Sequence, residues 1–374
     1  MAELINNKYP IKIEVLTPLS VGAGEEKNWK QNVDYIIKDG KLYHLSLKKM
    51  VESGIDVNKI ANYFSKPSPE ALRNLISENQ LEQYSDIILD CPVECSNDYK
   101  SFIRNDFTNK PYIPGSSIKG AIRSGLLHSM LKGQKLVKDK NNNFILKESD
   151  YFGVLKYGED FMRYIKIADC EFEKTELVNS KIYNLRSING DWEGGWKHGA
   201  NNTDDEYIPT KFNTIYESLT PTMSSIGSIS ISKNSIFKHG VNTHLKKEIL
   251  NNNGIIQLFK CINECTKEYL NAEKKFFEVY DHGMGSDEIL ASIDSILDLI
   301  PTDNSYCILK MSAGTGFHSI TGNWQYKDFT ETGIWDRNNT KNKNLLNKKR
   351  YKSHKIADYK ENLTLMGFIK ISLL

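Results

Sequence analysis

The sequence has no run of apolar residues long enough to cross a membrane. Nothing in its 374 residues approaches the ~20 consecutive apolar residues that a membrane span needs. The first residues show no basic segment followed by an apolar one, which argues against a secretory signal. The six cysteines have neither zinc-ribbon spacing nor the density of a disulfide framework. We therefore expect a protein of the cytoplasm, with no membrane partner, no bound metal and no cofactor.

Excess charge is also scarce, because the formal net charge is only +2. The chain as a whole therefore does not have the composition of a nucleic-acid-binding protein. Positive charge gathers in one place, residues 341–360, where eight Lys or Arg face the single acid Asp358. Interspersed asparagines predict that this stretch is a surface loop, and such a loop offers a surface for polyanions.

The periodicity of the sequence predicts an α+β protein with antiparallel sheets, in two similar halves. Residues 10–24 alternate as a half-buried strand, and residues 34–47 form a hairpin around Asp39 and Gly40. Residues 188–206 are rich in Gly and Asn and predict a long surface loop. Further strands are expected at 163–173, 305–312 and 364–374, and helices at 69–84, 115–132, 244–280 and 285–299.

The least ordinary stretch is "PYIPGSSIKGAIRSGLL", residues 111–127. Gly115 allows close backbone approach, and the N–H groups of the first helical turn favour an anion. The two cations four residues apart project from the same helix face. Together these features predict a phosphate-binding site made by Gly115, Ser116, Ser117, Lys119, Gly120 and Arg123.

That site matches neither of the common nucleotide motifs. A Walker A loop needs Lys directly after its second glycine, whereas Ala121 follows Gly120 here, and no G-x-G-x-x-G is present. ATP and NAD are therefore poor ligand candidates. Two more glycine loops follow predicted strands and suit single-stranded RNA, with aromatic rings to stack on bases. Their candidate residues are Gly22 and Gly24 in "LSVGAG", and Gly314, Gly316, Phe317 and His318 in "AGTGFHSITG".

These motifs in this order resemble the RAMP superfamily of CRISPR-associated proteins. "TPLSVGAG" follows a first strand, "YIPGSSIKGAIRSGLL" opens a helix, and a late glycine loop precedes a terminal "GFIKI" strand. The resemblance implies two ferredoxin-like, RRM-related domains. We expect residues 1–168 to form the first, with a helical insertion at about 46–110, and residues 169–374 the second, with one at about 244–300.

The long separation of the first two motifs, by residues 25–110, resembles one branch of the superfamily. This branch is the family of fifth subunits of the Csm complex, which cap type III-A effector complexes at the 3′ end of the guide. It implies a non-catalytic RNA-binding subunit that assists crRNA maturation. The implied partners are crRNA, the repeating RAMP backbone subunit, the small helical Csm subunit, host ribonucleases and, indirectly, target RNA. A backbone or tail subunit of another type III complex is an alternative.

The enzymatic alternative is a RAMP ribonuclease acting on guide or target RNA. In backbone subunits of such complexes an acid just after the first glycine turn cleaves target RNA, and Glu25, Glu26 and Asp34 lie in that region. Acids that flank a strand are normally solvated. The histidines show no pairing in the sequence, and His318 suits stacking or phosphate contact better than catalysis. We therefore expect no nuclease site, and the alternative would act through Glu25, Asp34 or His318.

Overall fold

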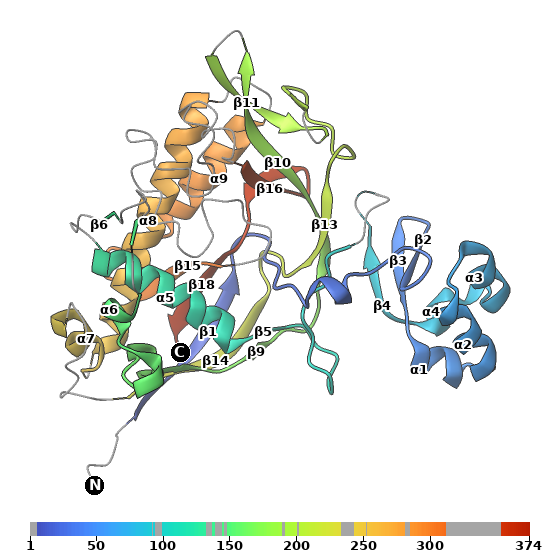
Figure 1. Cartoon of the computed structure of the whole chain (residues 1–374), viewed down its shortest axis with the longest axis horizontal. Coiled ribbons are helices and arrows are strands. Elements are labelled where there is room, and N and C mark those ends of the chain that lie inside the picture. The colour runs from blue at the N-terminus through green and yellow to red at the C-terminus, as the bar shows by residue number, and fades with distance from the viewer. Residues whose placement is uncertain are drawn as a thin grey trace.

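Figure 1 shows a computed structural model of the chain, which consists of antiparallel sheets with helices on their faces and a small module set apart from the main body. Pairings between the named strands are all antiparallel, which confirms the predicted α+β class. The structure describes residues 6–91, 93, 99–131, 137–138, 144–145, 148–188, 191–199, 202–232, 243–251, 253–280, 285–311 and 353–374.

The first sheet has five strands in the order β15-β18-β1-β14-β8. Its members are β1 (Asn6–Val15), β8 (Ile165–Ile167), β14 (Ser224–Ser232), β15 (Tyr306–Lys310) and β18 (Phe368–Leu373). Two long helices connect these strands, α5 (Gly115–Leu131) and α8 (Gly254–Tyr280). The order of elements along the chain is the βαββαβ order of a ferredoxin-like fold, made by β1, α5, β8, β14, α8 and β18. The additional strand β15 extends that sheet beside β18.

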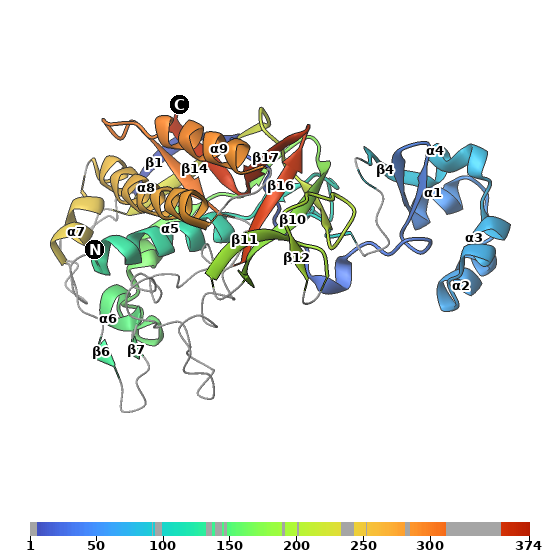
Figure 2. The same cartoon turned by 90° about the horizontal axis from the view of Figure 1, so that it is seen from above.

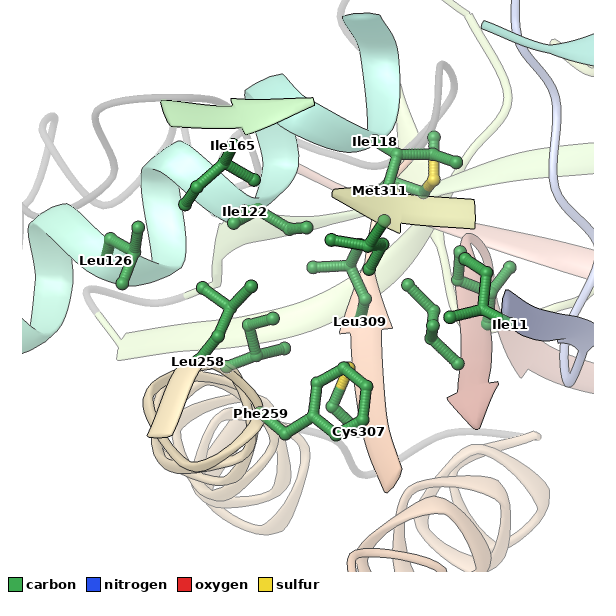
Figure 3. Packing of buried hydrophobic residues seen from close by; sticks show 14 of the residues in the cluster. Ile11, Ile118, Ile122, Leu126, Ile165, Leu258, Phe259, Cys307, Leu309 and Met311 are labelled. Atoms are coloured by element: carbon green, nitrogen blue, oxygen red, sulfur yellow. The ribbon is translucent and has the colours of Figure 1, made fainter. Parts of the chain in front are cut away.

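The main hydrophobic core lies between this sheet and the helices α5 and α8 (Figure 3). Ile11 and Ile13 alternate inward along β1, as the sequence predicts, and both are fully buried. Ile118 and Ile122 on α5 meet them from the helical layer, where Leu258 and Phe259 of α8 also pack. Each fully buried aliphatic side chain of this kind contributes about 1.5–3 kcal/mol. This core fixes α5, and with it the predicted phosphate-binding turn, against the sheet.

The second sheet has the order β12-β11-β10-β16-β17, with β13 paired to β10. The C-terminal half of α8 and all of α9 (Ser286–Asp298) cover it through a second core that includes Leu270, Phe277 and Ile293. Its strands are β10 (Glu176–Ile188), β11 (Asp191–Lys197), β12 (Thr203–Asp204), β13 (Thr214–Ser218), β16 (Ser353–Tyr359) and β17 (Asn362–Leu365). One helix, α8, therefore contributes to both cores.

Two predicted loops are wrong where the structure describes them. Much of the predicted loop 188–206 is the β10–β11 hairpin and β12, because Trp196 is buried edge-on against Tyr183, with ring centroids 5.2 Å apart. Gly194 permits this packing, since a β-carbon there would overlap the Tyr183 ring. In the basic stretch 341–360, residues 353–359 form β16 within the sheet, and residues 341–352 lie outside the described residues.

Residues 30–91 form the small module at the right of Figures 1 and 2. The predicted hairpin is confirmed, with Asp39 and Gly40 in the left-handed region at φ 51° and 73°. Its strands are β2 (Tyr35–Lys38), β3 (Lys41–Leu45) and β4 (Ser85–Asp90). The helix predicted at 69–84 is two shorter ones, and two helices precede it. The module's α-helices are α1 (Leu47–Glu52), α2 (Val57–Ser65), α3 (Pro69–Leu75) and α4 (Leu81–Tyr84).

A narrow neck joins this module to the body. It consists of two segments of the chain, which pair at Trp29 and Tyr99. Each of these residues donates its backbone N–H to the other's carbonyl at 2.9 Å. The rings of Tyr35 and Tyr99 lie 4.8 Å apart, and the cluster that holds them reaches Leu177 and Ile215 of the body. The neck is therefore a packed junction with its own small core.

The remaining elements are short. They are β5 (Tyr112–Ile113), β6 (Val137–Lys138), β7 (Phe144–Ile145), β9 (Cys170–Glu171), α6 (Glu148–Phe152) and α7 (Thr243–Ile249), with 3-10 turns at Glu25–Lys27, Glu78–Gln80, Leu155–Tyr157 and Phe161–Tyr164.

The two predicted domains meet in the first sheet, because β1 and β8 belong to residues 1–168 and the other strands of this sheet to residues 169–374. The boundary near residue 168 stays a prediction. Within the described residues, no helix combines the length and apolarity needed to span a bilayer.

Candidate nucleic-acid interface

The first two glycine motifs come together in space, although residues 25–110 separate them in the sequence. The returning chain, residues 101–104, lies between them: Ile103 donates its N–H to Val21 at 2.9 Å and accepts one from Tyr112 at 3.3 Å. Both outer segments run antiparallel to it, so they are parallel to each other. Neighbouring strands lie about 4.8 Å apart, which puts Val21 and Tyr112 about 10 Å from each other. The turns at Gly24 and Gly115, each three residues further on, therefore emerge at the same end.

The glycine turn after the first strand is exposed. Gly22 and Gly24 both face solvent, and a β-carbon on Gly22 would meet no atom within 4 Å. Gly24 has φ 114°, a conformation that side chains disfavour, and the 3-10 turn Glu25–Lys27 follows it. The turn therefore leaves room for a ligand backbone, and the contact of Gly22 and Gly24 with RNA stays a prediction.

Gly115 at the start of α5 has an internal role. A β-carbon on Gly115 would overlap the carbonyl oxygen of Ile167, so only glycine lets the helix begin against the end of β8. Its N–H donates to Asp169 Oδ1 at 2.7 Å, so a carboxylate of this chain already sits at the helix N-terminus. Pro114 caps the first turn through its carbonyl, which accepts from Ser117 at 2.9 Å. Within the described residues, neither the Ser116 hydroxyl nor the Ser117 hydroxyl forms a hydrogen bond that caps the helix.

The outer side of the first helical turns is nevertheless open. Ser116 and Gly120 are exposed, and the space above Gly120 holds no atom within 4 Å of a β-carbon. Ser117 lies partly exposed next to them. The sequence predicts that a ligand backbone can approach closely at Gly115. In the structure the open position is Gly120 instead.

The two predicted cations differ in their surroundings. The guanidinium of Arg123 binds Glu148 and Asp160 at 3.1 and 3.0 Å and lies 4.0 Å above the Phe152 ring. The ammonium of Lys119 makes no recorded ion pair with the described residues. Partial burial lowers the pKa of Lys119, the charge of Asp160 opposes this, and Arg123 and Lys166 lower it further. Lys119 is thus the cation available to a ligand, and Arg123 holds the segments around α6 in place.

The acids near the first turn are either exposed or bonded to backbone. Glu25 and Glu26 are exposed, and Asp34 Oδ2 accepts the Lys30 N–H at 2.8 Å, which stabilises a turn at the entry of the module. No group of three His, Cys, Asp or Glu side chains suited to a metal ion occurs in the described part of the chain.

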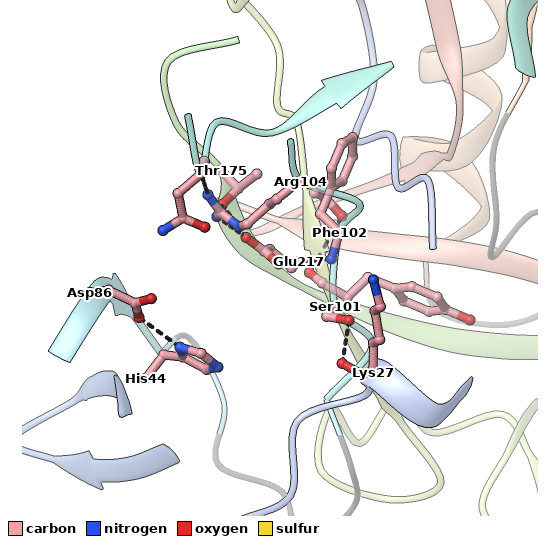
Figure 4. Close-up of polar contacts among 11 residues, drawn as sticks. Lys27, His44, Asp86, Ser101, Phe102, Arg104, Thr175 and Glu217 are labelled. Carbon is pink, nitrogen blue, oxygen red and sulfur yellow. Dashed lines mark hydrogen bonds and ion pairs between the residues drawn. The ribbon is translucent and has the colours of Figure 1, made fainter. Parts of the chain in front are cut away.

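Several pairings of histidines with distant acids were missed from the sequence, and one of them lies at the neck. His44 Nδ1 lies 2.7 Å from Asp86 Oδ1 (Figure 4), and its ring packs 4.5 Å from Trp29 at the neck. Burial alone would raise the pKa of Asp86, but the hydrogen bond and charge of His44 outweigh it and lower that pKa. Antiparallel pairing of β3 with β4 brings them together, and the sequence spacing carries no sign of it.

The late glycine loop cannot be compared with its prediction, because Gly314, Gly316, Phe317 and His318 lie outside the described residues. The strand before it ends in Lys310, whose Nζ lies 2.5 Å from the Tyr269 hydroxyl. Burial lowers the pKa of Lys310 to about 7. Nearby, His354 pairs with Glu273 at 2.6 Å in the interior. Lys310 and His354 therefore make their contacts inside the protein.

The chain is similar to known proteins in sequence and in fold. The family model of the RAMP superfamily matches residues 12–326. Two relatives named CRISPR system Cms protein Csm5 are similar in sequence. That of Methanocaldococcus jannaschii is 28% identical over 196 residues, 47% of this chain and 46% of the relative. That of Streptococcus thermophilus is 27% identical over 201 residues, 46% of this chain and 54% of the relative. The chain thus spans about half the length of the relatives it matches.

Two solved structures share the fold. A chain in the cryo-EM structure of a type III-A Csm–crRNA–target RNA ternary complex matches with a TM-score of 0.61 at 16% identity, over 98% of this chain and 100% of that one. The crystal structure of T. onnurineus Csm5 matches with a TM-score of 0.60 at 18% identity, over 96% and 99%. At such identities the likeness establishes a common fold.

Proposed function

Because the chain belongs to the RAMP superfamily, we propose that it is an RNA-binding subunit of a type III-A CRISPR effector complex. The relatives named Csm5 and the fold shared with a chain of a Csm–crRNA–target RNA complex support this proposal. In this role it caps the stack of backbone subunits at the 3′ end of the crRNA and assists crRNA maturation. Its partners are then crRNA, the repeating RAMP backbone subunit, the small helical subunit, host ribonucleases and, indirectly, target RNA.

The observation that carries the proposal is that the open glycine turn after the first strand and the start of α5 emerge at the same end, with Lys119 available on that helix. Gly22 and Gly120 both present bare backbone to solvent, and Lys119 lies on the same helix as Gly120. A polymer backbone with regularly spaced phosphates can follow such a surface, whereas a compact nucleotide would need a closed pocket. RNA is therefore the ligand that this surface favours.

We expect Lys119→Ala to weaken binding of single-stranded RNA and to lower the slope of log K against log salt by about 0.7, the contribution of one phosphate contact on a single strand. Arg123→Ala should act mainly on stability, lowering the free energy of unfolding by about 1–3 kcal/mol, because the poorly exposed Asp160 loses its charged donor. Fluorescence anisotropy over a salt series and urea unfolding separate the two effects.

Lys66→Ala, an exposed lysine of the module, is the matched control for loss of one positive charge. If Lys119→Ala and Lys66→Ala bind RNA with the same affinity and the same salt slope, the assignment of Lys119 as a phosphate contact is wrong. An Arg123→Ala variant that keeps full stability but loses RNA binding would instead make Arg123 the binding cation.

We also propose that the protein does not cleave RNA by itself, since the acids after the first turn are exposed or hold a backbone turn. Labelled single-stranded RNA should stay intact with the purified protein, with and without divalent metal ions. Cleavage that disappears in Glu25→Ala, Asp34→Ala or His318→Ala would support the ribonuclease alternative.

A further inference from the structure

The five-stranded sheet has a second face, opposite the main core, and among the described residues no helix covers it along β1 and β14. Alternation places Lys8 and Lys12 on this face of β1, because Ile11 and Ile13 point into the core. Residues directly opposite in an antiparallel pair share a face. The register pairs Lys8 with Ser230, and Ser230 with Lys166 of β8. Lys370 of β18 pairs with Glu14 and so joins them. We call Lys8, Lys12, Lys166 and Lys370 the lysine face.

This face is open and positively charged. Lys8 and Lys166 are exposed, and Ile226, the direct neighbour of Lys12, is 69% exposed. Glu14 is the one acid that the register places here among the described residues of these strands. The Lys12 hydrogen bond, opposed by burial and assisted by Lys370, lowers the pKa of Glu14. Four lysines therefore outweigh one carboxylate over an area about 13 by 15 Å, from the strand rise and spacing.

Between the lysines the face carries hydroxyl groups. Register places Ser224, Ser228, Ser230 and Ser372 on it. Serine hydroxyls can donate to phosphate oxygens and can exchange hydrogen bonds with ribose hydroxyls. The aromatic side chain Tyr306 lies under the Lys370 ammonium, 4.5 Å from the ring centroid, so one of its ring faces is already occupied. The chemistry here suits a sugar–phosphate backbone better than stacked bases.

The lysine face also continues the interface at α5. Lys166 lies on the edge strand β8, and its charge acts on the ammonium of Lys119. The start of α5 packs directly against the end of the same strand, through Gly115 and Ile167. A strand of RNA leaving the Gly120 turn therefore needs only to pass over β8 to reach the sheet.

We propose that the lysine face binds the sugar–phosphate backbone of single-stranded RNA, independently of base sequence, as an extension of the interface at α5. The proposal rests on the proposed RNA-binding function and adds a second, separate contact surface to it. Its occupant is a polyanion with ribose hydroxyls; an anionic membrane surface is the competing occupant that the experiment must distinguish.

The test uses the full chain carrying Lys8→Gln and Lys166→Gln together, because neither lysine has a recorded ion pair with the described residues. Each lost phosphate contact should lower the salt slope by about 0.7, so the pair should lower it by about 1.4. Affinity for an unstructured fluorescent RNA should fall several-fold, equally for two unrelated sequences. Combination with Lys119→Ala should lower the slope further. The control removes two exposed lysines of the module, Lys48→Gln and Lys59→Gln.

If the parent protein binds RNA while Lys8→Gln/Lys166→Gln shows the same RNA affinity and the same salt slope, the proposal of RNA binding by the lysine face is wrong. That result would leave the proposed interface at α5 unaffected. A parent that binds no RNA would overturn the proposed function itself. If the double variant loses binding only to phosphatidylserine vesicles, the face is a membrane surface and the proposal is wrong. Equal melting temperatures of parent and variants exclude unfolding as the cause of any loss.

Discussion

Replacing Glu217 with alanine should lower the free energy of unfolding by about 3–5 kcal/mol, the usual cost of removing one partner from a buried ion pair. Glu217 on β13 is fully buried and pairs with Arg104 (Figure 4). Thr175 donates to the same oxygen as Arg104, Oε1, at 2.6 Å, and the other oxygen, Oε2, accepts the Phe102 N–H at 2.7 Å. Alanine would leave a guanidinium, a backbone N–H and a hydroxyl without their acceptor.

The loss should be specific to this buried site. Glu173→Ala removes an 85% exposed partner of Lys110 and should cost no more than about 1 kcal/mol. Glu217→Gln keeps the volume and one acceptor oxygen, so it should fall between the two and gives a measurable value if the alanine variant does not fold. Urea unfolding of the three variants tests the order. A cost below about 1 kcal/mol for Glu217→Ala would contradict the role assigned to this network.

Two glycines of the same helix should respond to alanine in opposite directions. Gly115→Ala places a methyl group on the carbonyl oxygen of Ile167 and displaces the N–H that binds Asp169. Overpacking of this kind costs about 1–3 kcal/mol, and more where backbone must move. Gly120→Ala points into open space and should stabilise the helix by about 0.5–1 kcal/mol.

The same pair separates folding from binding. If RNA backbone lies against Gly120, the alanine variant should bind RNA more weakly although it is more stable. Denaturant unfolding and RNA titration on both variants provide the test. A stabilised Gly120→Ala variant with unchanged RNA affinity would mean that the ligand does not approach this turn. A tolerated Gly115→Ala would mean that α5 and β8 are less tightly fixed than their contact implies.

Local patterns predicted those parts of the fold that depend on neighbours in the sequence. The alternation of Ile11 and Ile13, and the turn at Asp39 and Gly40, are both as expected. Glycine and asparagine content misled at residues 188–206, because Trp196 and Tyr183 supply the packing that makes a hairpin there. The helices of residues 47–65 are only six and nine residues long, which is shorter than the window of about 11–18 residues over which a helical period is read.

The sequence indicates which segments to consider as a binding site, but it does not show the surroundings of each residue, and the site itself stays a prediction. The sequence marks Gly115 as special, yet only the structure shows that its neighbour is Ile167 rather than a ligand. Lys119 and Arg123 look equivalent at four-residue spacing, and the difference comes from Glu148 and Asp160, which lie 25 and 37 positions from Arg123. The lysine face has no local signature, because its four members come from three strands brought together by pairing.

The position of β18 affects the order in which the protein can form during synthesis. This strand lies between β15 and β1. The edges of β15 and β1 that it pairs with therefore stay unpaired until residues 368–373 have been made. Its partner β1 is the first strand of the chain, and such distant pairings are slow to form because a long loop must close. Unpaired strand edges are prone to association with other chains. The nascent protein should therefore depend on chaperones, or on early capture of its exposed β1 edge, more than its compact helical parts would suggest.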